Sequence, residues 1–267
     1  MIGVSVSFSE HVDLLDLHGR AAVASLGQLQ PGDPVPPRAA TAREVGGDHW
    51  ATLEVWAWSL ENPKDHWSSR EAPDSPPDHA ALVAGVATQL DRLEASLLAA
   101  GPDAVVDYFG EPGTTSRVAR LLAHEAITVA RAVSLAASRQ SPPLSAVVAA
   151  DGIDQTLGHW ESPDARLTWR PETVALQAND IEESWHVQVS RSKVGADPEI
   201  RLVPATTADA AVEGAAEDLL GWLHGFSPAD GAVSMTGDRE ALVVLRSSLM
   251  HPAPEPPRRT RRRRWFG

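Results

Sequence analysis

The spacing of apolar residues constrains the fold of this chain more than any other feature of its sequence. Apolar side chains recur every three or four positions in four long segments, residues 9–29, 41–60, 77–100 and 114–137. That period places them on one face of a helix. Four long helices, each with one apolar stripe, can bury those stripes against each other, which predicts an N-terminal four-helix bundle.

The period changes after residue 160. A hinge at residues 140–144 and a short helix at 145–159 come first, and two further helices are predicted at 215–224 and 239–249. Alternating apolar residues predict strands at 165–170, 174–178, 185–190, 199–203, 208–213 and 232–236. The fold class is therefore α + (α/β): a bundle over residues 1–160, a small α/β domain with a mainly antiparallel sheet over 161–250, and a disordered, arginine-rich tail over 251–267.

Composition limits the chemistry. The chain has no cysteine, so disulfides, thiolate metal sites and cysteine nucleophiles are excluded, and any thiol must come from a cofactor. The formal charge is −13, although six arginines lie within the last ten residues. Such an acidic body repels nucleic acid and anionic membranes. Nucleic-acid binding is therefore expected only through the arginine-rich tail, if at all.

The sequence contains no apolar run long enough to span a membrane. Its first ten residues lack the basic and apolar regions of a signal peptide, so we expect a cytoplasmic protein. A small-molecule substrate is the expected partner, and the chain is expected to be a monomer or a homodimer.

Three polar residues interrupt the apolar stripes of the predicted helices. His18, His49 and Glu125 all face inward by period. A carboxylate that faces a bundle core is costly unless it is paired, protonated or bound to a metal, and bundles build metal sites from such residues. We therefore consider these three residues candidate metal ligands. The alternative is a hydrogen-bonded core histidine and a carboxylate paired with an arginine.

Other polar residues carry weaker signals. His124 and Arg120 fall on the opposite face of the fourth segment, where they are either solvated or in contact with the second domain. The nine tryptophans pack the core and the domain interface, or line an apolar pocket. The sequence has no serine–histidine nucleophile motif, phosphate loop or dinucleotide fingerprint.

Several short motifs resemble those of the mycothiol-dependent maleylpyruvate isomerase family. They are Val35-Pro36 with His49 downstream, residues 107–112 and 119–125 (ending Ala-His-Glu), residues 149–154 (Ala-Ala-Asp-Gly-Ile-Asp), residues 211–220, and residues 236–238. Together they extend from about residue 35 to residue 249.

The resemblance implies a DinB-like bundle followed by a sterol-carrier-like α/β domain. It also implies a divalent metal, often zinc, held by one histidine on the second helix and a Glu-x-x-x-His pair on the fourth. His49 and Glu125 match the first two ligands, but Val129 stands at the third. Phe226 stands where the family often has an arginine placed to hold an anionic substrate. We take His18 as the replacement ligand.

The resemblance implies that metal-bound mycothiol loses its thiol proton and adds to an electrophile. The expected function is thus a divalent-metal, mycothiol-dependent isomerase or thiol transferase acting on a small electrophilic substrate. One alternative is a metal-free family member that binds a small molecule without catalysis, because Val129 and Phe226 replace polar groups. Another is an interaction or regulatory protein that uses the basic tail.

Overall fold

The computed structural model of the protein describes residues 6–161, 171–190 and 199–249. The strand predicted at 165–170 and the tail at 251–267 lie outside the described residues. No helix in the described part of the chain is long and apolar enough to cross a membrane.

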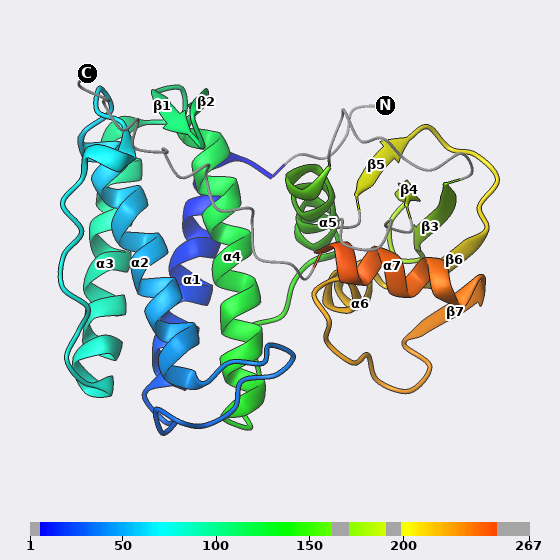
Figure 1. Ribbon diagram of the computed structural model, residues 1–267, viewed down its shortest axis with the longest axis horizontal. Helices are drawn as coiled ribbons and strands as arrows, with labels where there is room; N and C mark the ends of the chain where they lie inside the picture. The colour runs from blue at the N-terminus through cyan, green and yellow to red at the C-terminus, as the bar shows by residue number, and fades with distance from the viewer. Residues whose placement is uncertain (1–5, 162–170, 191–198, 250–267) are drawn as a thin grey trace, which may run out of the picture.

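Four long helices pack together in the N-terminal half (Figure 1). They are α1 (Phe8–Leu26), α2 (Ala42–Glu61), α3 (His79–Ala100) and α4 (Thr115–Ala136). Their N-termini are capped by side chains, with complete capping boxes at Ser7 and Thr41 and single caps at Asp78 and Thr114. A short 3-10 helix, η1 (Trp67–Ser69), follows α2.

A small hairpin between α3 and α4 was not predicted from the sequence. Strands β1 (Val105–Tyr108) and β2 (Glu111–Thr114) pair antiparallel around Phe109 and Gly110. Both turn residues have positive φ, 56° and 91°, as the favoured two-residue hairpin turns require. Each strand has four residues, and Pro112-Gly113 indicated a break in the sequence, so periodicity carried no strand signal here.

The C-terminal half contains α5 (Ala146–Trp160) and a five-stranded sheet in the order β5-β4-β3-β6-β7. The strands are β3 (Glu172–Ala178), β4 (Ser184–Val189), β5 (Ile200–Val203), β6 (Ala210–Gly214) and β7 (Val233–Gly237). The sheet is mixed, because β3 pairs parallel with β6 while the other pairings are antiparallel. Helices α6 (Ala216–Leu223) and α7 (Arg239–Leu249) complete this half.

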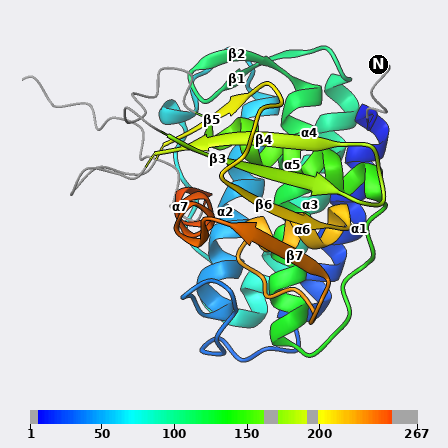
Figure 2. The same ribbon diagram turned by 90° about the vertical axis from the view of Figure 1, so that its right-hand side faces the viewer.

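The two halves meet through a layer of helices. α5 and α6 lie between the sheet and the bundle, and the sheet faces outward (Figure 2). The buried face of α5, including Ile153 and Leu157, packs in one core with Val174 and Val187 of the sheet. The boundary predicted at residue 160 assigned this helix to the bundle, but its apolar contacts join it to the α/β half.

Candidate functional site

The centre of the bundle brings two of the candidate ligands together. His49 on α2 is 1% exposed, and its Nδ1 lies 3.3 Å from Oε1 of Glu125 on α4. The Glu125 side chain is 27% exposed, so the pair reaches the surface through its carboxylate. Nε2 of His49 is buried and has no hydrogen-bond partner. One imidazole nitrogen of the pair is therefore buried without a hydrogen bond.

His18, the third candidate, does not join this pair. It is 1% exposed on α1, and neither ring nitrogen has a hydrogen-bond partner. Burial lowers its pKa to about 4, with a further contribution from nearby His124. Among the described residues, one group offers three potential ligand atoms within 4.8 Å of one another, and it contains neither His18, His49 nor Glu125.

The direction of neighbouring side chains on α4 explains why His18 lies apart. Successive residues of a helix point about 100° away from each other. His124 and Glu125 therefore face different neighbours, and His18 lies in the electrostatic neighbourhood of His124. The apolar period shows which face of each helix is buried. It does not show which buried side chains of two helices contact each other.

Apolar residues fill the two positions at which the resemblance implies polar groups. Val129 follows Glu125 by one helical turn and is buried. Phe226, in the segment after α6, is 6% exposed and belongs to the same apolar cluster as Val129 and Val45. A catalytic zinc site commonly has three protein ligands. His49 and Glu125 supply two, so the residues present do not fit a zinc site of the implied type.

Asp48 lies within electrostatic reach of Glu125. The pKa of the Asp48 carboxyl is raised, first by desolvation and then by the negative charges of Glu125 and Glu44, while Arg38 opposes the shift. Arg38 and Asp48 precede His49 in the chain, so one stretch of sequence supplies both charges beside the pair. These groups can position a polar small molecule near Glu125.

A second polar cluster joins the two halves of the protein. Nε2 of His11 on α1 and Nε2 of His124 on α4 lie 2.9 Å and 2.7 Å from Oδ2 of Asp151 on α5. Arg120 places Nε 3.0 Å from Oδ1 of the same carboxylate. Burial alone would raise the pKa of Asp151, but the hydrogen bonds from both histidines and the charge of Arg120 hold it well below its usual range.

Sequence reasoning did not find this cluster. It assigned no role to His11 and left His124 and Arg120 either solvated or against the second domain. In the structure both residues contact Asp151 of α5, a helix that the predicted boundary at residue 160 had left in the bundle. The sequence signal that could have indicated the cluster is that His124 and Asp151 both lie in motifs of the family resemblance. The sequence alone does not show that these two motifs are close in space.

His224 extends the polar contacts between the two halves. Its Nδ1 lies 3.0 Å from the hydroxyl of Thr128 on α4, and its Nε2 lies 2.9 Å from that of Thr156 on α5. Burial lowers the pKa of His224 to about 3, and electrostatic repulsion from the charged form of His124 and from Arg38 and Arg131 acts in the same direction. This histidine is therefore a neutral bridge between helices.

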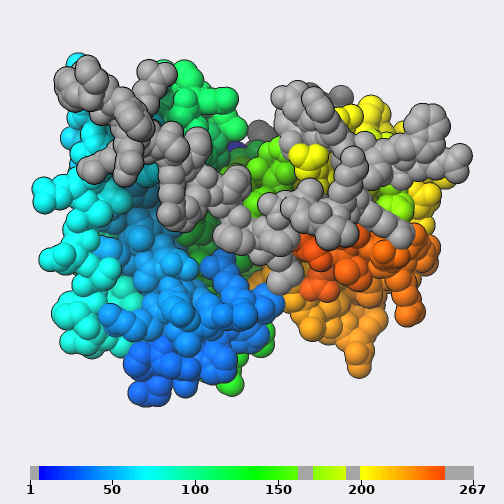
Figure 3. Space-filling view, in the orientation of Figure 1, coloured from blue at the N-terminus to red at the C-terminus, as the bar shows by residue number. Residues whose placement is uncertain are grey.

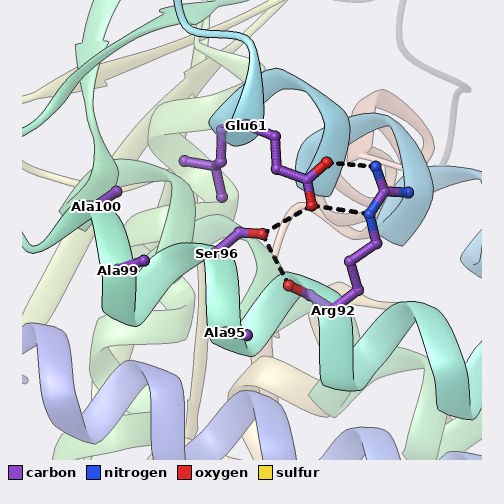
Figure 4. A pocket seen from close by; sticks show the side chains of 7 residues that line it. Glu61, Arg92, Ala95, Ser96, Ala99 and Ala100 are labelled. Carbon is purple, nitrogen blue, oxygen red and sulfur yellow. Dashed lines mark hydrogen bonds and ion pairs between the residues drawn. The ribbon is translucent and has the colours of Figure 1, made fainter.

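A surface groove at the ends of α2 and α3 is separate from both clusters (Figure 4). Glu61 accepts hydrogen bonds from Nε and Nη2 of Arg92, at 2.9 Å and 2.6 Å, and another from Ser96. The charges of Glu61 and Arg92 in this groove are therefore paired with each other. Glu61 also lies twelve residues beyond His49, about 18 Å along α2 at 1.5 Å per residue.

The helical bundle with its attached α/β unit is a fold that this chain shares with solved structures of a mycothiol-dependent maleylpyruvate isomerase. The crystal structure of the mycothiol-dependent maleylpyruvate isomerase has a TM-score of 0.63 to this chain and is 12% identical. The similarity covers 87% of this chain and 95% of that one. A histidine-to-alanine mutant of that enzyme gives a TM-score of 0.61 at the same identity and coverage.

Sequence comparisons alone do not find this relationship. No family model matches the sequence, and no curated protein matches it significantly. The structural similarity confirms the maleylpyruvate isomerase fold of helices and sheet that the short motifs indicated, while the DinB-like and sterol-carrier-like assignments stay predictions. At 12% identity the similarity establishes the fold, and function must be argued from the side chains.

Proposed function

We propose that the protein is a divergent relative of the mycothiol-dependent maleylpyruvate isomerase. In this proposal it uses mycothiol, or a closely related thiol, to isomerise or conjugate a small electrophilic substrate. The shared fold over 87% of the chain supports the proposal. The chain has no cysteine, so the thiol of this proposal comes from outside the chain.

The observation that carries the proposal is the free nitrogen of His49. Nδ1 of His49 lies within hydrogen-bond distance of Glu125, and in the tautomer in which Nδ1 donates to this carboxylate, Nε2 keeps its lone pair. A buried acceptor without a partner is unfavourable, and a ligand that donates a proton to it removes that cost. A carboxylate that orients an imidazole in this way is a common device for activating a nucleophile.

The proposed chemistry needs only this pair and the two reactants. His49 Nε2 accepts the thiol proton, and the thiolate adds to one carbon of an activated double bond. The resulting single bond rotates, and expulsion of the thiolate restores the double bond in the other geometry. Alternatively, the adduct takes a proton at carbon and the thioether is released. Glu125 stabilises the imidazolium in both routes.

The divalent metal predicted with His18, His49 and Glu125 has no step in this proposal. His49 and Glu125 supply two ligands, while Val129 cannot coordinate a metal. Thiol activation by the histidine–glutamate pair is therefore expected to persist in the presence of a chelator.

The test is a thiol-dependent rate measured on purified protein with excess chelator. Maleylpyruvate and a generic electrophilic dye serve as substrates, with and without mycothiol. We expect mycothiol-dependent turnover that falls about 100-fold or more in His49→Ala and in Glu125→Gln. His66→Ala, which removes an exposed histidine on the loop after α2, is the matched control and should keep the wild-type rate.

Metal-free binding without catalysis is the second candidate function. The apolar packing of Val129 and Phe226 favours it, because both positions have lost polar groups implied by the resemblance. Thermal stabilisation by mycothiol without turnover would select this candidate. If mycothiol produces no turnover and no thermal stabilisation, both candidate functions are contradicted. Turnover that is abolished by chelation would contradict the metal-free mechanism.

A further inference from the structure

The residues that join the bundle to α5 have the composition of a metal site. Three side chains from three helices, His11, His124 and Asp151, present ligand atoms within 4.8 Å of one another. Both histidines are buried, and the carboxylate between them is 13% exposed. This group is separate from the His49–Glu125 pair.

We propose that His11, His124 and Asp151 bind a divalent transition-metal ion of the zinc type and that this ion fastens α5 to the bundle. Two imidazoles and one carboxylate are a known ligand set for zinc. The site contains no soft sulfur ligand and too few oxygens for calcium or magnesium, which favours a metal that accepts nitrogen ligands.

The spacing of the three ligand atoms is close to what such an ion needs. Zinc binds nitrogen and carboxylate oxygen at about 2.0–2.2 Å, which places tetrahedral ligands about 3.3 Å from each other. Both Nε2 atoms lie 2.7–2.9 Å from Oδ2 of Asp151. Moving each imidazole outward by about 0.5 Å therefore makes room for the ion.

Surrounding contacts hold the ligands in place. Arg120 hydrogen-bonds the backbone carbonyl of Asp151 at 3.0 Å and its Nε lies at the same distance from Oδ1, leaving Oδ2 to face the histidines. Gly152 lies against the His124 ring, where an added Cβ would stand 2.9 Å from Nδ1. Such outer contacts orient metal ligands and tune affinity. The positive charge of Arg120 weakens cation binding, so we expect moderate affinity.

The competing interpretation is a tether without an ion, in which both imidazoles donate Nε2 protons to Asp151. The two interpretations predict different responses to added metal. Untagged full-length protein is stripped with a chelator, dialysed and titrated with Zn²⁺ by calorimetry, and the bound metal is measured by elemental analysis. We expect one Zn²⁺ per chain and a higher melting temperature with Zn²⁺ than without it.

Two histidines on α1 provide a matched pair of variants. His11→Ala removes a proposed ligand, whereas His18→Ala removes an equally buried histidine two turns along the same helix. We expect His11→Ala to weaken Zn²⁺ binding by about 100-fold or more, beyond the effect typical of outer contacts. His18→Ala and His49→Ala should keep wild-type affinity. Asp151 retains His124 and Arg120 in the His11→Ala variant, so the fold should persist, and circular dichroism checks this.

Absence of Zn²⁺ binding to the wild type would overturn the proposal in favour of the tether. Binding that survives in His11→Ala but fails in His49→Ala would also overturn it, by assigning the ion to the other pair. If His11→Ala fails to fold, the test uses the visible absorption spectrum of the wild-type protein loaded with Co²⁺. A spectrum that shows no imidazole bound to Co²⁺ would contradict the site. Metal binding is measured without thiol, so its outcome is independent of the proposed function.

Discussion

Buried histidines are the most informative single residues of this protein because similar side chains occupy different electrostatic settings. His49 faces a carboxylate, His224 bridges two hydroxyls, and His18 has no hydrogen-bond partner on either nitrogen. A buried imidazole without a partner is held neutral, since the charged form loses its hydration. The consequence is a dependence of stability on pH that a single substitution can isolate.

We predict that stability falls as the pH decreases from about 6.5 toward 4. The unfolded chain takes up a proton on His18 near pH 6.5, while the folded chain resists until the lowered pKa of about 4. Neutral His18 therefore does not lower the free energy of unfolding above pH 6.5, and this free energy falls on acidification below that pH. The loss is about 1.4 kcal/mol per pH unit within that window. Urea unfolding at pH 7, 6 and 5 measures it.

His18→Leu should flatten this profile, because a leucine takes up no proton in either state. The remaining slope then reports other groups, including His224, whose pKa is lowered in the same direction by its burial. Parallel profiles for the wild type and His18→Leu would show that His18 is not held neutral in the folded protein.

The sequence predicts that these residues are buried, but it does not predict which residues they contact. Helical period alone placed His18, His49 and Glu125 on inward faces, and all three are at least partly buried. It could not predict that His124, next to Glu125 in the chain, faces α5 and is buried too. A stripe defines one buried face, but α4 buries side chains on several sides because it packs against both halves of the protein.

At the scale of single elements, α5 depends on close approach to the bundle. Gly152 allows α5 to contact the His124 ring, whereas Gly158, six residues further along the same helix, has nothing within 4 Å of an added Cβ. The two glycines therefore separate the effect of contact from the effect of helix propensity.

We predict opposite effects for alanine at these two glycines. Gly152→Ala would place Cβ 2.9 Å from both Nδ1 of His124 and Cδ2 of Leu220, which should destabilise the protein by about 1–3 kcal/mol. Gly158→Ala should stabilise it by about 0.5–1 kcal/mol through helix propensity. Chemical denaturation measures both, and a stabilising Gly152→Ala would contradict the packing of α5 on α4.

On α4, the spacing of four residues allows a lost ligand to be restored. Val129→His would place an imidazole one turn from Glu125 on the same face, next to His49. We predict that this variant binds one Zn²⁺ more than the wild type, measured by elemental analysis. The imidazole enters an apolar cluster, so the variant should be less stable without Zn²⁺ and recover when it is added.

Two controls define this gain of binding. The double variant His49→Ala with Val129→His should lose the additional ion, and Val129→Ala should never acquire it. An additional ion that remains in the double variant would place it elsewhere and contradict the assumed geometry of α2 and α4.

Element prediction succeeded where the apolar periodicity is clear and failed where it is absent. The helical segments at 9–29 and 41–60 correspond to α1 and α2 within a few residues, because each extends over several turns. The β1–β2 hairpin was missed because the sequence of β2, Glu-Pro-Gly-Thr, has no apolar alternation and its Pro112-Gly113 indicates a break. The sheet was predicted to be mainly antiparallel, but the parallel pairing of β3 with β6 was not predicted, since alternation identifies strands and leaves their direction open.

At the scale of the whole molecule, the sequence indicated two units but not how they dock. The contacts between them join residues far apart in the chain, such as Thr128 with His224 and Arg131 with the carbonyl of Glu217. No local pattern encodes such pairs. The space-filling view shows the two halves side by side, with blue and cyan helices on the left and the orange C-terminal elements on the right (Figure 3).

Phe226 is the apolar anchor of this docking. It follows α6 in the second half, yet it is buried in a cluster built from α1, α2 and α4, and Arg131 lies over its ring at 5.2 Å. The position at which the resemblance implies an anion-binding arginine is thus used here for cohesion between the halves. If this view is correct, removal of the ring should weaken the whole molecule and not only one half.

We therefore predict that Phe226→Ala lowers the free energy of unfolding by about 3–5 kcal/mol, the range for loss of a fully buried phenylalanine. Phe109→Ala is the matched control, because that ring is 60% exposed at the hairpin tip and its removal leaves no closed cavity. Urea unfolding followed by tryptophan fluorescence measures both variants. Separate transitions in Phe226→Ala would mean that this ring couples the two halves. Equal losses in the two variants would mean that Phe226 does not anchor the interface.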